Sequence, residues 1–359
     1  MALSKIPSAG FQDNVKFRNI FINGDMSIAQ RGTSESGITG SGYYTVDRWK
    51  TSISSLGTWT QTQSTDVPSG QGFAKSLKLD CTTADASPSA DNVLFFQQAI
   101  EGQNLQYLKF GTSNAQQLTL SFWVKTNKTG TYICEIINID STTSVSKSYT
   151  INSANTWEKK TINIPADTSN GFDNDNADSL RVYFWLGAGT NYTSGTLNTS
   201  WNSFTTANRA VGQVNLADST SNEWYITGVQ LEAGTTASDF EFLPYDVNLN
   251  RCHRYYQFIV SGTGKAIGDG GAYSTSNAWS FVHTKPFRVK PSIDIVTGTN
   301  YYSFIGNATS FSVSNVFLEG NSSANVIRVA NTSVSVTQGR SYLLATANSN
   351  AFIGFDAEL

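Results

Sequence analysis

The chain has 359 residues, enough for two domains with cores of ordinary size. Its 24 Lys and Arg against 27 Asp and Glu give a net charge of −3, so we expect neither nucleic-acid binding nor membrane insertion. Charged residues make up only 14% and aromatic residues 12%, which excludes a disordered chain and is typical of short strands joined by tight turns.

The first part of the chain predicts an arm followed by a β-sandwich. Residues 1–17 are polar and irregular and have no apolar signal core, so we expect an N-terminal arm or attachment segment. Residues 18–245 then form one domain. It opens with "RNIFINGDMSIAQRGT", which predicts a strand and an Asn-Gly-Asp turn. The clearest later strands are 118–126, 131–140, 156–165, 179–187 and 223–232. This pattern predicts a two-sheet antiparallel sandwich of the jelly-roll type.

A second domain is expected at residues 246–359. A Pro and a polar stretch near 240–250 interrupt the pattern, after which about seven further strands follow. Short helical turns are possible only at 113–118 and 247–256. The predicted fold class is therefore all-β, a jelly-roll β-sandwich followed by a second, smaller β-sandwich.

The chain carries no recognisable catalytic or nucleotide-binding motif. His253 and His283 are its only histidines, and neither shares a metal-ligand spacing with a cysteine. Residues 262–268, "GTGKAIG", miss the spacing of a phosphate-binding loop and predict a glycine-rich hairpin loop. The three cysteines are too few and too scattered for a disulfide framework (Cys81, Cys134 and Cys252). We expect no enzyme and no cofactor.

One acidic loop is a candidate calcium site. Asp173, Asp175 and Asp178 lie in "GFDNDNADS" and could supply oxygen ligands to Ca²⁺. The spacing does not match an EF-hand, and Asn- and Asp-rich loops also form because these residues tolerate turn conformations. A plain loop is the alternative.

Aromatic residues on the second face of two strands are the candidate binding residues. Trp123 shares one face of its strand with Ser121 and Lys125, and Arg181, Tyr183 and Trp185 share one face of theirs. A sandwich buries one face of each sheet, so the second face needs a purpose. Three purposes stay open: glycan binding, a subunit interface, or cover by the chain's own loops.

Several segments together resemble bacteriophage tail-fibre and related virion proteins. They are "RNIFINGDMSIAQRGTS", "YYTVDRW", "VQLEAG", "FEFLPYDVNLNRCHRYYQ", "WSFVHTKPFRVKPSI" and "FIGFDAEL", in this order along the chain. The resemblance implies a component of a fibre, tail tip or other virion appendage that is a homo-oligomer, a trimer. It also implies synthesis in a host cytoplasm without a signal peptide, and contacts to other virion proteins through the arm.

The first domain also resembles a carbohydrate-binding module. Residues 23–27, "NGDMS", are similar to the opening of such modules, and 225–229, "YITGV", to their closing strand. In these modules, acids at both places commonly hold a structural Ca²⁺. Here Ser27, Thr227 and Gly228 replace three of them, which puts the calcium site in doubt.

Three functions are compatible with the sequence. The first is a non-enzymatic virion protein that attaches to host-surface glycans, with weak sites multiplied by an oligomer. The second is a capsid decoration, head fibre or adaptor without receptor binding. The third is a polysaccharide-binding module or depolymerase, although no acidic pair for such an enzyme can be assigned.

Overall fold

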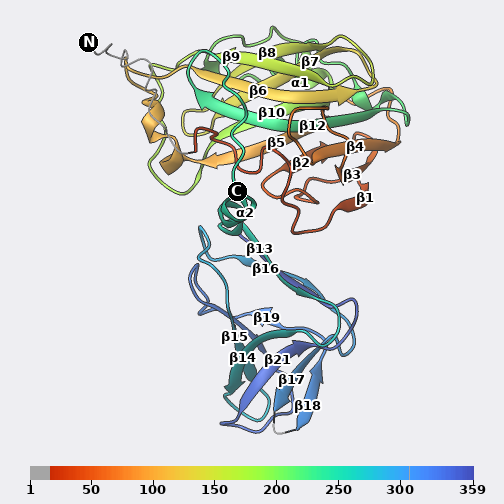
Figure 1. The fold of residues 1–359 in the computed structure, drawn as a ribbon, viewed down its shortest axis with the longest axis vertical. Coiled ribbons are helices and arrows are strands. Elements are labelled where there is room, and N and C mark those ends of the chain that lie inside the picture. Colours follow the sequence, from red (N-terminus) through yellow and green to blue (C-terminus); the bar gives the residue numbers. More distant parts are fainter. Residues whose placement is uncertain (1–16, 307) are drawn as a thin grey trace, which may run out of the picture.

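The computed structural model describes residues 17–306 and 308–359, which form an all-β protein (Figure 1). The arm predicted at 1–17 lies outside the described residues apart from Phe17. The first sandwich contains the strands β1 (Ser34–Ile38), β2 (Lys50–Ser54), β3 (Thr58–Ser64), β4 (Ser76–Thr83), β5 (Val93–Glu101), β6 (Leu118–Thr126), β7 (Gly130–Asn138), β8 (Thr143–Ile151), β9 (Glu158–Ile164), β10 (Asp178–Ala188), β11 (Asn202–Ser203) and β12 (Glu223–Ala233), with the short helix α1 (Thr190–Thr193).

These strands form two six-stranded antiparallel sheets. One has the order β1-β3-β4-β12-β6-β9 and the other β11-β8-β7-β10-β5-β2. Consecutive strands pass repeatedly from one sheet to the other, as in the predicted jelly roll. The five clearest predicted strands are all present, as β6, β7, β9, β10 and β12.

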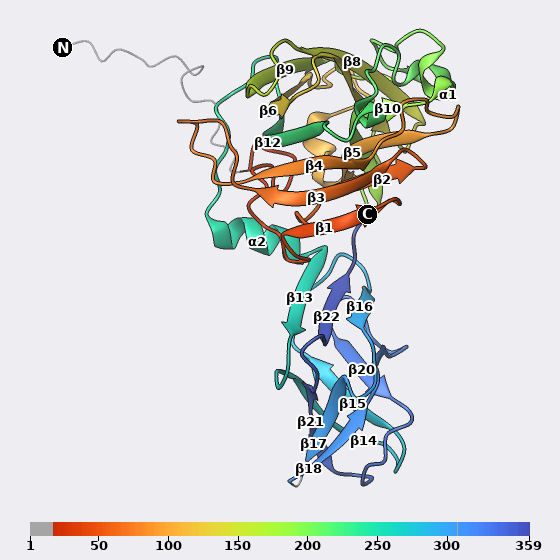
Figure 2. The same ribbon diagram turned by 90° about the vertical axis from the view of Figure 1, so that its right-hand side faces the viewer.

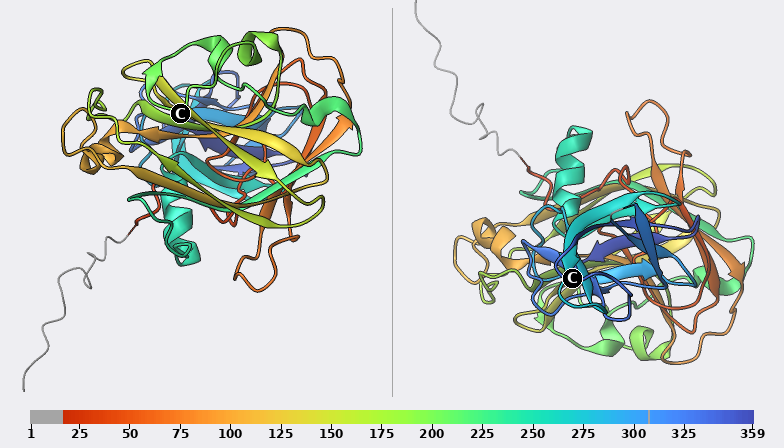
Figure 3. Two further views of the ribbon diagram at one scale, coloured as in Figure 1. Left: turned by 90° about the horizontal axis from the view of Figure 1, so that it is seen from above. Right: turned by 90° about the horizontal axis from the view of Figure 1, so that it is seen from below.

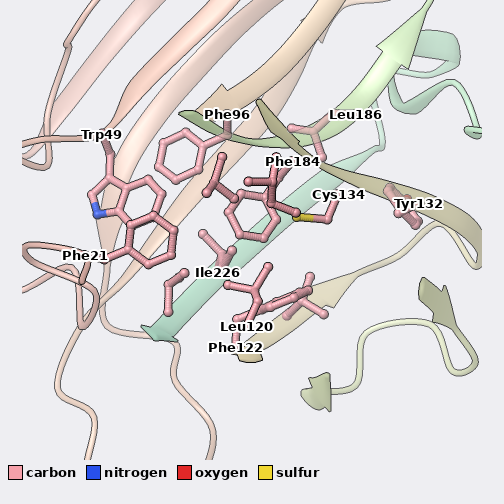
Figure 4. Packing of buried hydrophobic residues seen from close by; sticks show 14 of the residues in the cluster. Phe21, Trp49, Phe96, Leu120, Phe122, Tyr132, Cys134, Phe184, Leu186 and Ile226 are labelled. Carbon is pink, nitrogen blue, oxygen red and sulfur yellow. The ribbon is translucent and has the colours of Figure 1, made fainter. Parts of the chain in front are cut away.

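The core of the first sandwich lies between these sheets and is rich in aromatic rings. Trp49 stacks on Phe96 at a centroid distance of 4.9 Å, and Phe184 meets Phe122 edge-on at 5.1 Å (Figure 4). Alternation along each strand brings one set of side chains inward. The three cysteines are buried and free.

The second sandwich follows the helix α2 (Tyr245–His253). A three-stranded sheet, β13-β22-β16, packs through a common core against a seven-stranded sheet, β18-β17-β21-β14-β15-β20-β19. Its strands are β13 (Tyr256–Ser261), β14 (Ala266–Ala272), β15 (Ala278–Val282), β16 (Ser292–Val296), β17 (Tyr302–Gly306), β18 (Thr309–Val313), β19 (Phe317–Leu318), β20 (Ile327–Asn331), β21 (Ser341–Thr346) and β22 (Phe352–Asp356).

The two sandwiches are arranged end to end. Figures 1 and 2 show α2 and β13 at the junction, and the last strand, β22, runs back so that the C-terminus lies against the first sandwich. Seen along the long axis, the C-terminal sheets lie beneath the first sandwich (Figure 3). The hydrophobic cores of the two parts share no residue. The predicted division at 245/246 stays a prediction, and it falls at the start of α2.

Three predictions of local structure need correction. The opening stretch forms no strand before β1, because the side chain of Gln98 bonds both the N–H and the C=O of Ile22, as a neighbouring strand would. The turn expected at 113–118 is not helical. The C-terminal part has more strands than predicted. One of the additional strands is β14, which was missed because it lies in a glycine-rich stretch. Residues 262–265 connect β13 to β14 in a different sheet, so they do not close the predicted hairpin.

Candidate functional site

The outer face of the sheet β11-β8-β7-β10-β5-β2 is covered by the chain itself. Tyr183 and Trp185 point away from the main core and pack against a segment that returns over the sheet at residues 189–215. Trp185 is 0% exposed and Tyr183 is 5% exposed. The Trp185 ring lies 5.5 Å from that of Tyr192, and the Arg209 guanidinium lies 5.0 Å from Trp185. This face is therefore a second, smaller core.

The prediction that Tyr183 and Trp185 form a glycan or subunit surface is consequently wrong, and the covering-loop alternative fits. A buried charge explains why the segment stays in place. Glu135 is 0% exposed and accepts hydrogen bonds from Arg209 Nε at 2.9 Å and from Trp185 Nε1 at 3.0 Å. Burial raises the pKa of Glu135, and the Arg209 guanidinium opposes this shift. A buried carboxylate needs such partners, so Arg209 ties the segment to the sheet.

The three acids of the candidate calcium loop do not come together. Asp178 forms an ion pair with Arg181, and the carboxylate of Asp175 accepts a hydrogen bond from the N–H of Ala177 at 2.9 Å, while Asp173 is exposed. Within the described ranges, no three His, Cys, Asp or Glu side chains are grouped so that they could hold a metal ion. The side chain of Arg181 is 38% exposed, and its role in binding stays a prediction.

The outer face of the opposite sheet, β1-β3-β4-β12-β6-β9, carries partly exposed aromatic rings, and we call it the open face. Trp123 points outward from β6, so it lies on the other sheet from the remaining three predicted residues. Trp157 precedes β9 and meets Tyr225 of β12 with ring centroids 6.1 Å apart. Both tryptophans are partly exposed, whereas Tyr225 is only 7% exposed.

Charged side chains hold these rings in position. Lys125 Nζ lies 4.2 Å from the centre of the Tyr225 ring and forms an ion pair with Asp66. The carboxylate of Asp66 also accepts a hydrogen bond from Trp157 Nε1 at 2.9 Å. Partial burial acts to raise the pKa of Asp66, but the bonds from Lys125 and Trp157 hold it below its ordinary value. The open face thus combines flat rings with fixed donors and acceptors.

The opening turn is held by amide and hydroxyl groups. Asn23 has a φ of 59°, the conformation predicted for an Asn-Gly turn. The carboxylate of Asp25 accepts hydrogen bonds from Ser27 Oγ at 3.0 Å and from Asn248 Nδ2 at 3.2 Å. Burial raises the pKa of Asp25, and these bonds oppose the shift. Ca²⁺ takes roughly six to eight oxygen ligands, so one carboxylate facing an amide N–H does not fit the ion.

The end of the opening stretch binds the second sandwich. Arg31 Nη2 donates to Asp356 at 2.8 Å, and its guanidinium lies 3.6 Å from the centre of the Tyr256 ring. Gln30 Nε2 donates to the backbone oxygen of Tyr256 at 2.9 Å, and the N–H of Phe258 donates to Gln30 Oε1 at 3.2 Å. The amide of Gln30 therefore pairs with β13 as an extra strand residue would.

Arg48 and Glu358 form the buried part of this junction. Arg48 is 1% exposed, forms an ion pair with Glu358 and lies 3.4 Å from the centre of the Tyr255 ring. Its Nη2 donates to the backbone oxygen of Ala99 at 2.7 Å, and Glu358 also lies 3.5 Å from Arg31. Burial acts to lower the pKa of Arg48, but the Glu358 carboxylate holds it above its ordinary value. Motifs that are hundreds of residues apart thus meet at one place.

A cavity of about 700 Å³ lies beside the junction, between α2 and β5. Its walls include Ile20, Ile100, Tyr107, Arg251 and Tyr255. Burial lowers the pKa of Arg251. Sequence spacing could not have found this cavity, because its walls come from segments that are far apart in the chain.

Comparisons with known proteins give distant structural neighbours. No family model matches the chain, and no curated protein matches it. A putative sugar-binding protein from Bacteroides thetaiotaomicron has 15% identity and a TM-score of 0.33, over 60% of this chain and 100% of that one. The carbohydrate-binding module TmCBM61 in complex with β-1,4-galactotriose has 10% identity and a TM-score of 0.30, over 60% and 99%. The enzymatically active domain of tailspike protein 4 of bacteriophage CBA120 has 15% identity and a TM-score of 0.32, over 61% of this chain and 22% of that one.

The neighbours thus include carbohydrate-binding modules and a phage tailspike domain, and this chain spans less than a quarter of the tailspike chain. Among the described residues, no helix has both the length and the apolar character needed to cross a membrane.

Proposed function

We propose that this chain is a non-enzymatic structural protein of a bacteriophage virion, in a tail fibre or other surface appendage, and that it attaches to host-surface glycans through the open face. The carrying observation is the asymmetry of the first sandwich. One outer face is sealed by the chain itself. On the open face, residues 238–241 cover Gln230 and Glu232, but Trp123 and Trp157 stay partly exposed beside Lys125 and Asp66. Flat rings suit the apolar faces of pyranoses, and charged groups suit sugar hydroxyls.

The virion part of the proposal depends on the ordered set of motifs. Residues of several of these motifs meet at the junction of the two sandwiches, which supports a single architecture for the chain. We further propose a homotrimer that multiplies weak sites, an arm at residues 1–17 that contacts other virion proteins, and a place on the virion surface after synthesis in the host cytoplasm.

The glycan site is tested with the double variant Trp123→Ala/Trp157→Ala on an array of bacterial surface oligosaccharides. Because truncating central aromatic contacts costs a large share of binding energy, we expect at least about tenfold weaker binding. Tyr245→Ala is the matched control, since that ring is 63% exposed and belongs to α2, not to a strand of the open face. Unchanged binding by the double variant would refute this site.

Three measurements separate this function from its alternatives. Incubation with host capsule or lipopolysaccharide should release no reducing ends, and their release would establish a depolymerase. Light scattering at micromolar concentration should give a trimer, and a monomer would contradict the fibre model. If antibody labels the virion but wild-type protein binds no glycan, a decoration or adaptor role replaces attachment.

A further inference from the structure

Three aromatic side chains lie together on the outer face of the seven-stranded sheet of the second sandwich. Trp279 and Phe281 alternate with core residues along β15, and Tyr273 follows β14 on the same face. The ring centroids of Tyr273 and Trp279 are 5.6 Å apart, and those of Trp279 and Phe281 are 5.0 Å apart. Tyr273 is 48% and Phe281 39% exposed. Packed rings left in contact with water indicate an interaction site.

The residues beside the central ring on the two neighbouring strands are small. The strand partners of Trp279 are Gly271 on β14 and Ala330 on β20. A Cβ added at Gly271 would lie 3.2 Å from the backbone oxygen of Arg340 and 3.6 Å from Cζ2 of the Trp279 ring, so any longer side chain at that position would extend beside the indole. The three rings therefore form an aromatic floor on this face of the sheet, which we call the C-terminal platform.

Polar groups lie on both sides of the C-terminal platform. On the β20 side, the Arg328 guanidinium lies 5.5 Å from the Tyr273 ring and 5.6 Å from the Trp279 ring, and it forms an ion pair with Glu319. On the β14 side, Asp269 is the strand partner of Phe281, and its carboxylate lies 3.6 Å from His283 Nε2. The side chains of Asp269 and His283 are 81% and 86% exposed, so their donors and acceptors are available to a ligand.

We infer that the C-terminal platform is a second glycan-binding site, separate from the open face, which holds pyranose rings on Tyr273, Trp279 and Phe281. The rings offer flat apolar surface, and Arg328, Asp269 and His283 offer charged hydrogen-bonding groups at its edges.

A second copy of this chain fits the platform less well. A stable protein interface buries about 800 Å² on each partner, and charged residues are depleted at its centre. On the C-terminal platform, Asp269 and Arg328 directly flank Phe281 as its strand partners. A second copy of the chain would have to remove water from the highly exposed Asp269 and His283, whereas a sugar supplies hydroxyl groups to them.

The test uses the full chain on the array of bacterial surface oligosaccharides. The variants are Tyr273→Ala/Trp279→Ala, which removes the floor, and Gly271→Leu, which keeps the rings but places a longer side chain beside the indole. The control is Ile305→Ala, which truncates a 39% exposed side chain on β17 of the same sheet. For at least one array glycan we expect both platform variants to bind about tenfold or more weakly, and the control to bind like wild type.

The outcomes separate this site from the open face. If the platform variants keep every wild-type signal, or the wild type gives none, the inference is overturned. A signal that survives Trp123→Ala/Trp157→Ala but is lost in the platform variants supports the inference even if the open face binds nothing. If light scattering shows that the platform variants lose an oligomer that the wild type forms, the platform is a subunit interface and the inference is overturned. Gly271→Leu leaves all three aromatic side chains in place. If the double variant misfolds, the glycan binding of Gly271→Leu still tests the inference.

Discussion

Glu358→Gln tests whether the buried charges of the junction stabilise the folded chain. The substitution keeps the shape of the side chain but removes the negative charge shared by Arg31 and Arg48. Arg31 retains its ion pair with Asp356 at 2.8 Å. Arg48 is 1% exposed, and among the described residues its ion pair is with Glu358. The change therefore leaves a buried guanidinium without its counter-charge.

The magnitude follows from the contacts that remain. Removing one member of a buried ion pair costs about 3–5 kcal/mol, because the other charge stays buried and unpaired. Arg48 keeps its bond to the backbone oxygen of Ala99 and its place over the Tyr255 ring, so we expect a loss near the lower end, about 3 kcal/mol. For a domain of roughly 150–250 residues, 1 kcal/mol shifts Tm by about 2–4 °C, which gives a fall of roughly 6–12 °C.

Differential scanning calorimetry at neutral pH measures this effect. Glu35→Gln is the matched control. It makes the same chemical change at an exposed position of β1, so it should alter the free energy of unfolding by less than about 0.5 kcal/mol. If the Tm of Glu358→Gln stays within about 2 °C of wild type, the junction charges do not contribute as the structure indicates.

Three further substitutions test other parts of the structure. Burial raises the pKa of Asp47 to about 6 from its ordinary 3.8, so the folded chain holds this proton more tightly than the unfolded chain. The wild type should therefore lose about 2 kcal/mol relative to Asp47→Asn as pH rises from about 4 to about 6, and a constant difference in urea unfolding across this range would contradict the shift. Trp185→Ala should destabilise the chain by about 3–5 kcal/mol, because the ring fills the second core of the first sandwich, and an unchanged urea midpoint would show that this core is not needed. Gly228→Ala should cost about 1–3 kcal/mol, because Gly228 has a φ of 62° and an added Cβ would lie 2.5 Å from the Phe73 ring; a midpoint equal to wild type would rule out this strain.

The architecture could be predicted from the sequence because strand alternation is a local property. The segments that became β6 and β10 show inward and outward residues at every second position, and the structure places Phe122 and Phe184 in the core as that pattern requires. The same local signal failed for β14, where glycines carry no side chain that could reveal the alternation.

The candidate site could be predicted only in part. The pattern correctly assigned Trp185 to the face of its strand that points away from the main core, but not the segment at 189–215 that covers that face. Which outer face is covered depends on a long loop and on one buried bond between Arg209 and Glu135, and neither leaves a periodic signal in the sequence. The C-terminal platform was missed because its rings lie on two strands, one of them in the glycine-rich stretch.

The sequence by itself determined the all-β class, the strands with clear alternation and the ordered set of motifs, because each depends on neighbouring residues. Only the tertiary structure decided what those motifs do: Gln30 and Arg31, near the start of the chain, bind Tyr256 and Asp356 near its end. It also decided which aromatic rings remain exposed. The physical reason is that burial and charge pairing are set by segments distant in the chain, and pairing of this kind has no local pattern from which it can be predicted.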